Sequence, residues 1–96
     1  MPTWADTAAF RRDLEALTPE QRAMFAVAVA HFVRDLRVGA FRKGLRVKKM
    51  AGRTDVWEMT WADDGRATFS FAEPVVNGEP HIVWRRIGTP DVLRRP

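Results

Sequence analysis

A chain of 96 residues, 46% of them hydrophobic and 29% charged, is long enough for one folded domain, residues 1–96, and too short for a second core. It contains no cysteine, which excludes disulfide frameworks, thiolate zinc sites and cysteine nucleophiles. The longest apolar run, Ala23 to Ala30, is far shorter than a membrane span. We therefore expect a soluble, unexported protein of the cytoplasm, with no membrane partner.

The positive charge is concentrated in two blocks. The net charge is +4 and the sequence pI is about 10.6. Residues 34–53 contain eight Lys or Arg against one Asp, and residues 85–96 contain four Arg against one Asp. Clustered cations of this kind favour a polyanion or an acidic protein as partner. The alternative is that these arginines only solvate the surface.

The first third of the chain predicts two helices that meet at a tight corner. Phe10, Leu14 and Leu17 recur at helical spacing. Thr18 then fits an N-cap, with Pro19 at the first helical position and Gln21 closing a capping box. The second helix presents an apolar stripe formed by Phe25, Val29, Phe32 and Leu36, and it is expected to stop before Gly39.

After Gly44 the pattern changes to the alternation that is typical of strands. Four strands are predicted, at residues 45–48, 56–61, 66–71 and 81–87, with turns at 63–65 and 77–80. In the middle two, Trp57, Met59, Trp61, Ala67, Phe69 and Phe71 share one face. The expected fold is α+β: an N-terminal helical hairpin packed on one face of a four-stranded, mainly antiparallel twisted sheet, followed by a short C-terminal helix or turn.

The opposite face of this sheet is predicted to be cationic and polar. Alternation assigns to it Arg46, Lys48, Glu58, Arg66, Thr68 and Ser70, and one of the neighbours Arg85 and Arg86. Cations on such a surface could hold a phosphodiester and neutralise charge that develops on its oxygens. The competing interpretation is a merely solvated sheet face.

Other candidate residues carry less information. His31 and His81 have no partner at metal-ligand spacing, so no metal or cofactor is expected. Trp57, Trp61 and Trp84 could stack on bases, although alternation favours core packing for the first two. Glu58 is a candidate general base, or else a partner in cross-strand ion pairs.

Four segments together resemble the RelE/ParE superfamily of bacterial toxins. They are Phe41 to Lys48, Val56 to Trp61, Asp64 to Phe69 and Ile82 to Thr89, so the likeness extends over nearly the whole chain. The order of two helices followed by a sheet agrees with that family. The RelE branch implies an endoribonuclease that cuts messenger RNA in the ribosomal A site, needs no metal, and is held inactive by a cognate antitoxin.

The resemblance also implies roles for individual residues. Arg46 and Lys48 correspond to the cations of the first strand, and Arg66 to the Arg after the hairpin turn, which together orient the phosphate and stabilise the transition state. Further RNA-binding cations are expected at Arg42, Lys43, Lys49, Arg85 and Arg86.

One position departs from the family pattern. After the last strand the family carries His or Arg, whereas this chain has Pro90 within Gly88-Thr89-Pro90-Asp91, and it has no Tyr at all. Proline can neither donate a side-chain proton nor carry charge, so we expect weak activity or none. Two alternatives stay open: a ParE-like toxin that acts by binding without nuclease chemistry, and a non-enzymatic nucleic-acid-binding domain.

Overall fold

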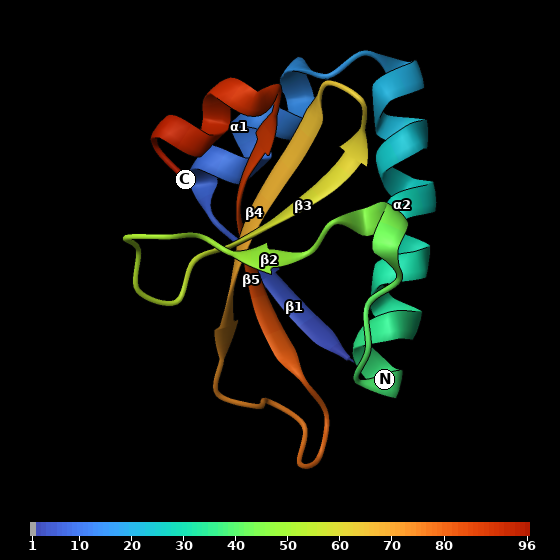
Figure 1. Ribbon diagram of the computed structural model, residues 1–96, viewed down its shortest axis with the longest axis vertical. Helices are drawn as coiled ribbons and strands as arrows, with labels where there is room; N and C mark the ends of the chain where they lie inside the picture. Colours follow the sequence, from blue (N-terminus) through green and yellow to red (C-terminus); the bar gives the residue numbers. More distant parts are fainter. Residues whose placement is uncertain (1) are drawn as a thin grey trace.

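The computed structural model describes residues 2–96 and has the predicted α+β architecture, with one strand more than expected (Figure 1). A five-stranded mixed sheet has the order β1-β5-β4-β3-β2. The elements are β1 (Thr3–Asp6), α1 (Ala8–Ala16), α2 (Pro19–Val38), the 3-10 turn η1 (Lys43–Leu45), β2 (Lys48–Lys49), β3 (Trp57–Ala62), β4 (Gly65–Ala72), β5 (His81–Gly88) and the 3-10 helix η2 (Pro90–Arg94). No helix in residues 2–96 is long and apolar enough to cross a membrane.

The helical hairpin forms where the sequence predicts it. The Thr18 side chain accepts a hydrogen bond from the backbone of Gln21 at 3.1 Å, and the Gln21 side chain accepts one from the backbone of Thr18 at 2.8 Å. This capping box satisfies two donors that the first turn of α2 would otherwise leave unpaired. The helix ends at Gly39, whose φ of 89° is easily reached only without a side chain.

Strand β1 was not predicted from the sequence. Its four residues pair in parallel with the first half of β5, with Thr3 opposite His81. The Thr3 hydroxyl and His81 Nδ1 lie 2.6 Å apart. Most of β1 is exposed, so it shows no alternation of buried and exposed positions that a sequence pattern could reveal. The predicted number of four strands was therefore wrong, because β1 adds a fifth strand at the edge of the sheet.

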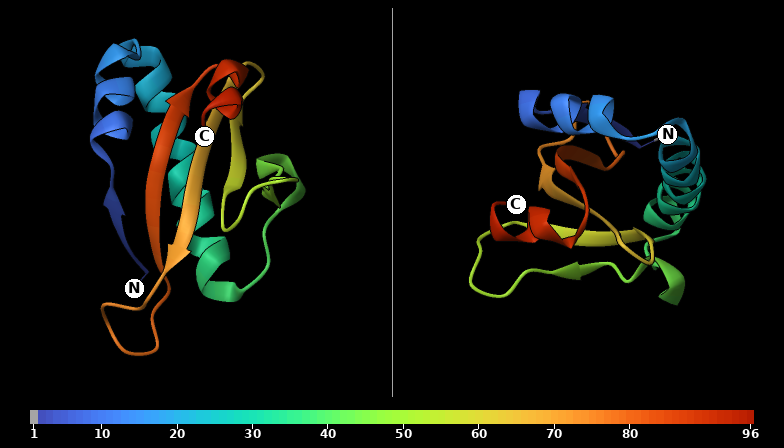
Figure 2. Two further views of the ribbon diagram at one scale, coloured as in Figure 1. Left: turned by 90° about the vertical axis from the view of Figure 1, so that its left-hand side faces the viewer. Right: turned by 90° about the horizontal axis from the view of Figure 1, so that it is seen from above.

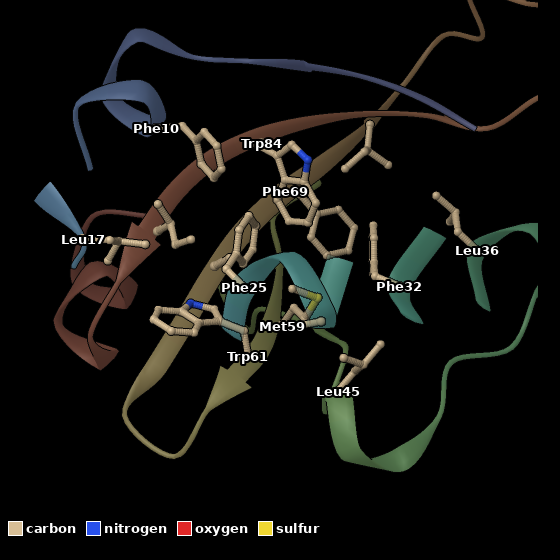
Figure 3. Packing of buried hydrophobic residues seen from close by; sticks show 14 residues of the cluster. Phe10, Leu17, Phe25, Phe32, Leu36, Leu45, Met59, Trp61, Phe69 and Trp84 are labelled. Atoms are coloured by element: carbon tan, nitrogen blue, oxygen red, sulfur yellow. The ribbon is translucent and has the colours of Figure 1, made fainter. Parts of the chain in front are cut away.

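The helices bury the aromatic face of the sheet (Figure 3). The Trp84 ring lies 5.2 Å from Phe32 and 5.5 Å from Phe25, measured between ring centroids. Met59 and Phe69 are completely buried beneath α2. Each large apolar side chain buried in this way contributes about 1.5–3 kcal/mol. This cluster is the main hydrophobic core.

Within residues 2–96, the helical element that packs on the other face of the sheet is η2. Figure 2 shows η2 on the side of β4 and β5 that faces away from α2. In η2 only Val92 is buried, and it packs toward Gly88, where an added Cβ would lie 3.0 Å from the valine side chain. The rest of this surface, which we call the polar face, presents the even-numbered side chains of β3 and β4, namely Glu58, Thr60, Arg66, Thr68 and Ser70.

Candidate nucleic-acid interface

The polar face contains an open pocket of about 300 Å³, which we call the cationic pocket. It is lined by Arg46, Val47, Lys48, Glu58, Thr60 and Arg66. The sheet register brings these residues together, because Lys48 is opposite Glu58 and Thr60 is opposite Arg66. Four of the residues singled out from the sequence thus line one pocket: Arg46, Lys48, Glu58 and Arg66.

The segment that carries Arg46 is not the strand that was predicted at residues 45–48. Residues 43–45 form η1, and Arg46 adopts a left-handed conformation with φ 47°. This turn sends Leu45 into the core, where it is 5% exposed. Only Lys48 and Lys49 pair with β3. The alternation of residues 45–48 was real, but a turn that buries one side chain produces the same pattern as a short strand.

Lys48 and Glu58 form an ion pair across β2 and β3. Their charged atoms lie 3.8 Å apart, and the Lys48 side chain is 69% exposed while that of Glu58 is 12% exposed. A pair with one exposed partner and a separation of 3.8 Å contributes about 1 kcal/mol to stability. The lysine can therefore turn toward an incoming anion at small cost.

Arg66 is held at the β3–β4 turn. Its Nη1 donates to the carbonyl oxygens of Ala62, Asp63 and Gly65 at 3.1, 3.2 and 2.9 Å. Within residues 2–96 its Nε and Nη2 make no hydrogen bond to the protein. One edge of the guanidinium is thus fixed, and the other remains available to a ligand rich in acceptor oxygens, such as phosphate.

Arg42 lies in a different environment from these cations. Its Nε and Nη2 donate to the two carboxylate oxygens of Asp35, each at 2.8 Å, and its Nη1 lies 2.6 Å from His31 Nδ1. Hydrogen bonds from the Arg42 side chain and backbone lower the pKa of Asp35 from 3.8 to about 2. We call Asp35, Arg42 and His31 the Arg42 clamp. It ties the loop after α2 to the end of that helix.

Of the remaining basic candidates, two are exposed to solvent and the others lie on β5. Lys43 and Lys49 are exposed, in η1 and β2. Arg86 forms a two-point ion pair with Asp13 of α1, with Nε–Oδ2 at 2.5 Å, and this bond raises the pKa of Arg86. The Asp13 carboxylate also accepts a hydrogen bond from the backbone N–H of Ile87 at 3.1 Å. Ile87 lies on β5 beyond the residues that pair with β1. The Arg86 and Asp13 pair therefore docks α1 onto β5.

Regular strand alternation, which predicts that Arg85 and Arg86 point to opposite faces, does not hold along the whole of β5. The register between β4 and β5 shifts, with Thr68 opposite Arg86 but Phe69 opposite Trp84. This irregularity inserts Arg85 as an extra residue, so Ile82, Trp84 and Ile87 are all buried despite their spacing. Arg85 donates to the Ser70 hydroxyl at 3.3 Å, on the polar face.

The C-terminal turn and the tryptophans bear on two further expectations from the sequence. Thr89 caps η2, accepting from the Asp91 backbone at 3.3 Å, and Pro90 is its first residue, so the short C-terminal helix is confirmed. Trp84 is 4% exposed within the core, and the suggestion that it stacks on bases is wrong. Trp61 is 8% exposed and also belongs to the core.

Some residues of this region were missed by the sequence analysis. Thr60 lines the cationic pocket, and its place between Glu58 and Ala62 in an alternating strand was a usable signal. Asp35 and Asp13, the partners of Arg42 and Arg86, lie far from them in the sequence or across a loop, and no local pattern reveals such pairs. No group of three or more acidic or histidine side chains that could hold a metal occurs in residues 2–96.

Comparison with known proteins identifies the fold. No protein-family model and no curated protein sequence matches the chain. Among solved structures, the DinJ–YafQ toxin-antitoxin complex of E. coli matches with TM-score 0.70 and 7% identity, covering 96% of both chains. The YoeB/ParE toxin from Agrobacterium tumefaciens matches with TM-score 0.65 and 11% identity over 93% of this chain and 98% of that one. The RelB–RelE complex of Methanococcus jannaschii matches with TM-score 0.61 and 14% identity over 95% of both.

These structures define the class to which the fold belongs. All three contain toxins of toxin-antitoxin systems, and each matches this chain over nearly its full length. The chain therefore has the RelE-like toxin fold. At 7–14% identity the likeness establishes the fold alone, and the function has to be argued from the site.

Proposed function

We propose that this chain, as a single domain, is the toxin of a type II toxin-antitoxin system and a ribosome-dependent endoribonuclease that cuts messenger RNA in the cytoplasm. The observation that carries the proposal is the cationic pocket, where Arg46, Lys48 and Arg66 from three separate elements converge on about 300 Å³ of open space. The fold shared with RelE, YafQ and YoeB/ParE toxins supports it.

The proposed chemistry uses groups of the RNA, side chains of the protein and solvent water. The ribose 2′-oxygen would attack the adjacent phosphorus, the bond from phosphorus to the 5′-oxygen would break, and a 2′,3′-cyclic phosphate would remain, while the leaving 5′-oxygen takes a proton from solvent water. Glu58 would accept the 2′-hydroxyl proton as the general base, and its carboxylate lies 3.8 Å from the ammonium group of Lys48 in the cationic pocket. Arg46 and the unengaged edge of Arg66 would neutralise the charge that grows on the phosphoryl oxygens.

Pro90 leaves this mechanism without a side-chain proton donor for the 5′-oxygen. Gly88 is opposite Arg66, which lines the pocket. Pro90 lies two residues after Gly88, just beyond the end of β5. The family resemblance assigns a His or Arg to this position. General acid catalysis is typically worth about a hundredfold to ten-thousandfold, and we therefore propose that the chain cuts RNA slowly.

The deciding experiment compares this chain with Pro90→His at matched expression. Growth arrest and cleavage of ribosome-bound messenger RNA, mapped by toeprinting, should both rise by a factor of about a hundred or more in the histidine form. Pro90→His combined with Arg66→Ala is the matched control and should lose that gain. If the proline and histidine forms cleave equally well, position 90 does not hold the general acid.

The proposed protein partner is a cognate antitoxin with an acidic surface. Met24 and Val27 are exposed on α2 and line, with Arg42 and Gly44, a second open pocket of about 340 Å³. An amphipathic, acidic segment could bury this apolar surface and form ion pairs with the basic block at residues 34–53. Association should slow as salt is raised. If no product of a neighbouring reading frame co-purifies with the chain, this part of the proposal fails.

One observation favours a second candidate function. Pro90 removes the expected acid and the chain has no Tyr, which suits a toxin that acts by binding alone. Growth arrest without any messenger RNA cleavage, in both the proline and histidine forms, would select this alternative. Salt-dependent RNA binding without growth arrest would select a non-enzymatic nucleic-acid-binding domain.

A further inference from the structure

Two buried polar atoms on the polar face have no hydrogen-bond partner in the structure. They are the hydroxyl oxygen of Thr68, a residue that is 0% exposed, and Nε of Arg85. The two residues are diagonal neighbours across β4 and β5, because Thr68 is opposite Arg86 and Arg85 is the inserted residue beside it. A buried group left without a partner costs roughly 1–3 kcal/mol, so a pair of them side by side calls for an explanation.

The segment that packs on this part of the sheet is η2 and the chain after it, whose last residue accepts a hydrogen bond from Arg85. This element contacts β4 and β5, and within Pro90–Arg94 only Val92 is buried. Three successive carbonyl oxygens, of Arg94, Arg95 and Pro96, accept from Arg53, Arg86 and Arg85 at 3.3, 3.1 and 3.3 Å. One apolar side chain and three long hydrogen bonds constitute a weak attachment, and such a segment opens more easily than the core.

The groups beneath the cover can all donate to an anion. Arg85 has its Nη1 on the Ser70 hydroxyl and its Nη2 on the Pro96 oxygen, each at 3.3 Å, while its Nε donates to nothing. The Pro96 oxygen thus takes the place on the guanidinium that a phosphate oxygen would occupy more strongly. The carboxylate of Glu58, opposite Thr68 on β3, is paired with Lys48, and that of Asp13 is paired with Arg86, opposite Thr68 on β5.

We propose that Arg85, Ser70 and Thr68 form a second anion subsite, covered by residues 90–96, that takes a phosphate group of single-stranded RNA when this segment lifts. The subsite adjoins the cationic pocket, since Thr68 is opposite Glu58, a residue that lines the pocket. Adjacent strands lie about 4.8 Å apart, so one RNA strand can reach both places. The inference rests on the proposed function, because it assigns a phosphate next to the one that is cut.

The test uses the full chain and RNA with 2′-O-methyl groups, which cannot be cleaved. Titration with a four-nucleotide oligouridylate, followed by NMR of arginine side chains, should shift the Arg85 Nε–Hε signal in a saturable manner. A two-nucleotide oligomer, too short to occupy both places, should leave that signal nearly unchanged. Val92→Ala, which weakens the cover, should raise the affinity for the longer oligomer several-fold by increasing the open population.

Substitutions separate this inference from the function on which it rests. Arg85→Ala should weaken binding of the four-nucleotide oligomer about tenfold or more and leave the two-nucleotide oligomer unaffected. Arg12→Ala, an exposed arginine on α1, is the matched control and should bind as the parent chain does. Circular dichroism would verify that each variant is folded, and the NMR titration of the unsubstituted chain does not depend on any variant.

Three outcomes are decisive. An Arg85 signal that responds only to the longer oligomer, together with loss of affinity in Arg85→Ala, establishes the subsite. An unresponsive Arg85 signal with unchanged binding by Arg85→Ala overturns it, and the cationic pocket stands if Lys48→Ala and Arg66→Ala still weaken binding. If none of these three substitutions weakens RNA binding, the proposed function fails together with the subsite.

Discussion

The two faces of the sheet are built by the same strands but satisfy their side chains differently. Under the helices, Phe32, Phe69 and Trp84 are buried and pack against one another between α2 and the sheet. On the polar face, Arg66 has one guanidinium edge without a partner, and the Thr68 hydroxyl is buried without one. Hydrophobic burial is therefore concentrated on the helical face, and the polar face keeps donors that could bind an anion.

The largest loss of stability is expected when the central aromatic ring between α2 and the sheet is removed. Phe32 is 1% exposed and contacts Phe41, Phe69 and Trp84. Phe32→Ala should lower the free energy of unfolding by about 3–5 kcal/mol, because it loses buried area and leaves a cavity. Urea unfolding followed by tryptophan fluorescence measures the change. A loss below about 1 kcal/mol would mean that the helices do not depend on this packing.

The next largest effect should have the opposite sign and come from the polar face. Thr68→Val keeps the shape of the side chain and removes a buried hydroxyl that has no partner. It should raise the free energy of unfolding by about 1–3 kcal/mol. Thr60→Val, on the same face but half-buried at the pocket, is the control and should change it by less than about 0.5 kcal/mol. A destabilised Thr68→Val would show that the hydroxyl is satisfied in solution.

The Arg42 clamp predicts how acid should act on the junction between α2 and η1. The pKa of Asp35 is held at about 2 in the fold against 3.8 ordinarily, so its contribution is fully present above pH 4. That contribution disappears as pH falls from about 4 to 2, because the unfolded chain takes up the proton first. The unfolding midpoints of the parent chain and Asp35→Asn should differ at pH 5 and converge toward pH 2. Asp64→Asn, at the exposed turn, should follow the parent at every pH.

The sequence predicts the helical face better than the polar face for a physical reason. Burial leaves a periodic pattern, so Phe25, Phe32, Met59 and Phe69 could be assigned to the core from that pattern alone. Ion pairs between distant segments leave none, and Asp13 and Arg86 are 73 positions apart. Arg42 was predicted to bind RNA on its charge, yet its guanidinium is occupied by Asp35 and His31. Charge density locates a basic surface, but only the fold shows which cations are already paired.

The smallest effect on stability should accompany a clear effect on binding, at Lys48. The Lys48 side chain is 69% exposed and its ion pair with Glu58 spans 3.8 Å, so Lys48→Ala should change the free energy of unfolding by about 1 kcal/mol or less. Affinity for single-stranded RNA should nevertheless fall, and the slope of log affinity against log salt should decrease by about 0.7 for one lost phosphate contact. Lys43→Ala, exposed in η1 and outside the pocket lining, is the matched control. An equal change of slope in both variants would mean that RNA senses the general charge of residues 34–53. A change confined to Lys48 would mean that the cationic pocket itself holds a phosphate, because each phosphate that a lysine neutralises releases counterions from the RNA.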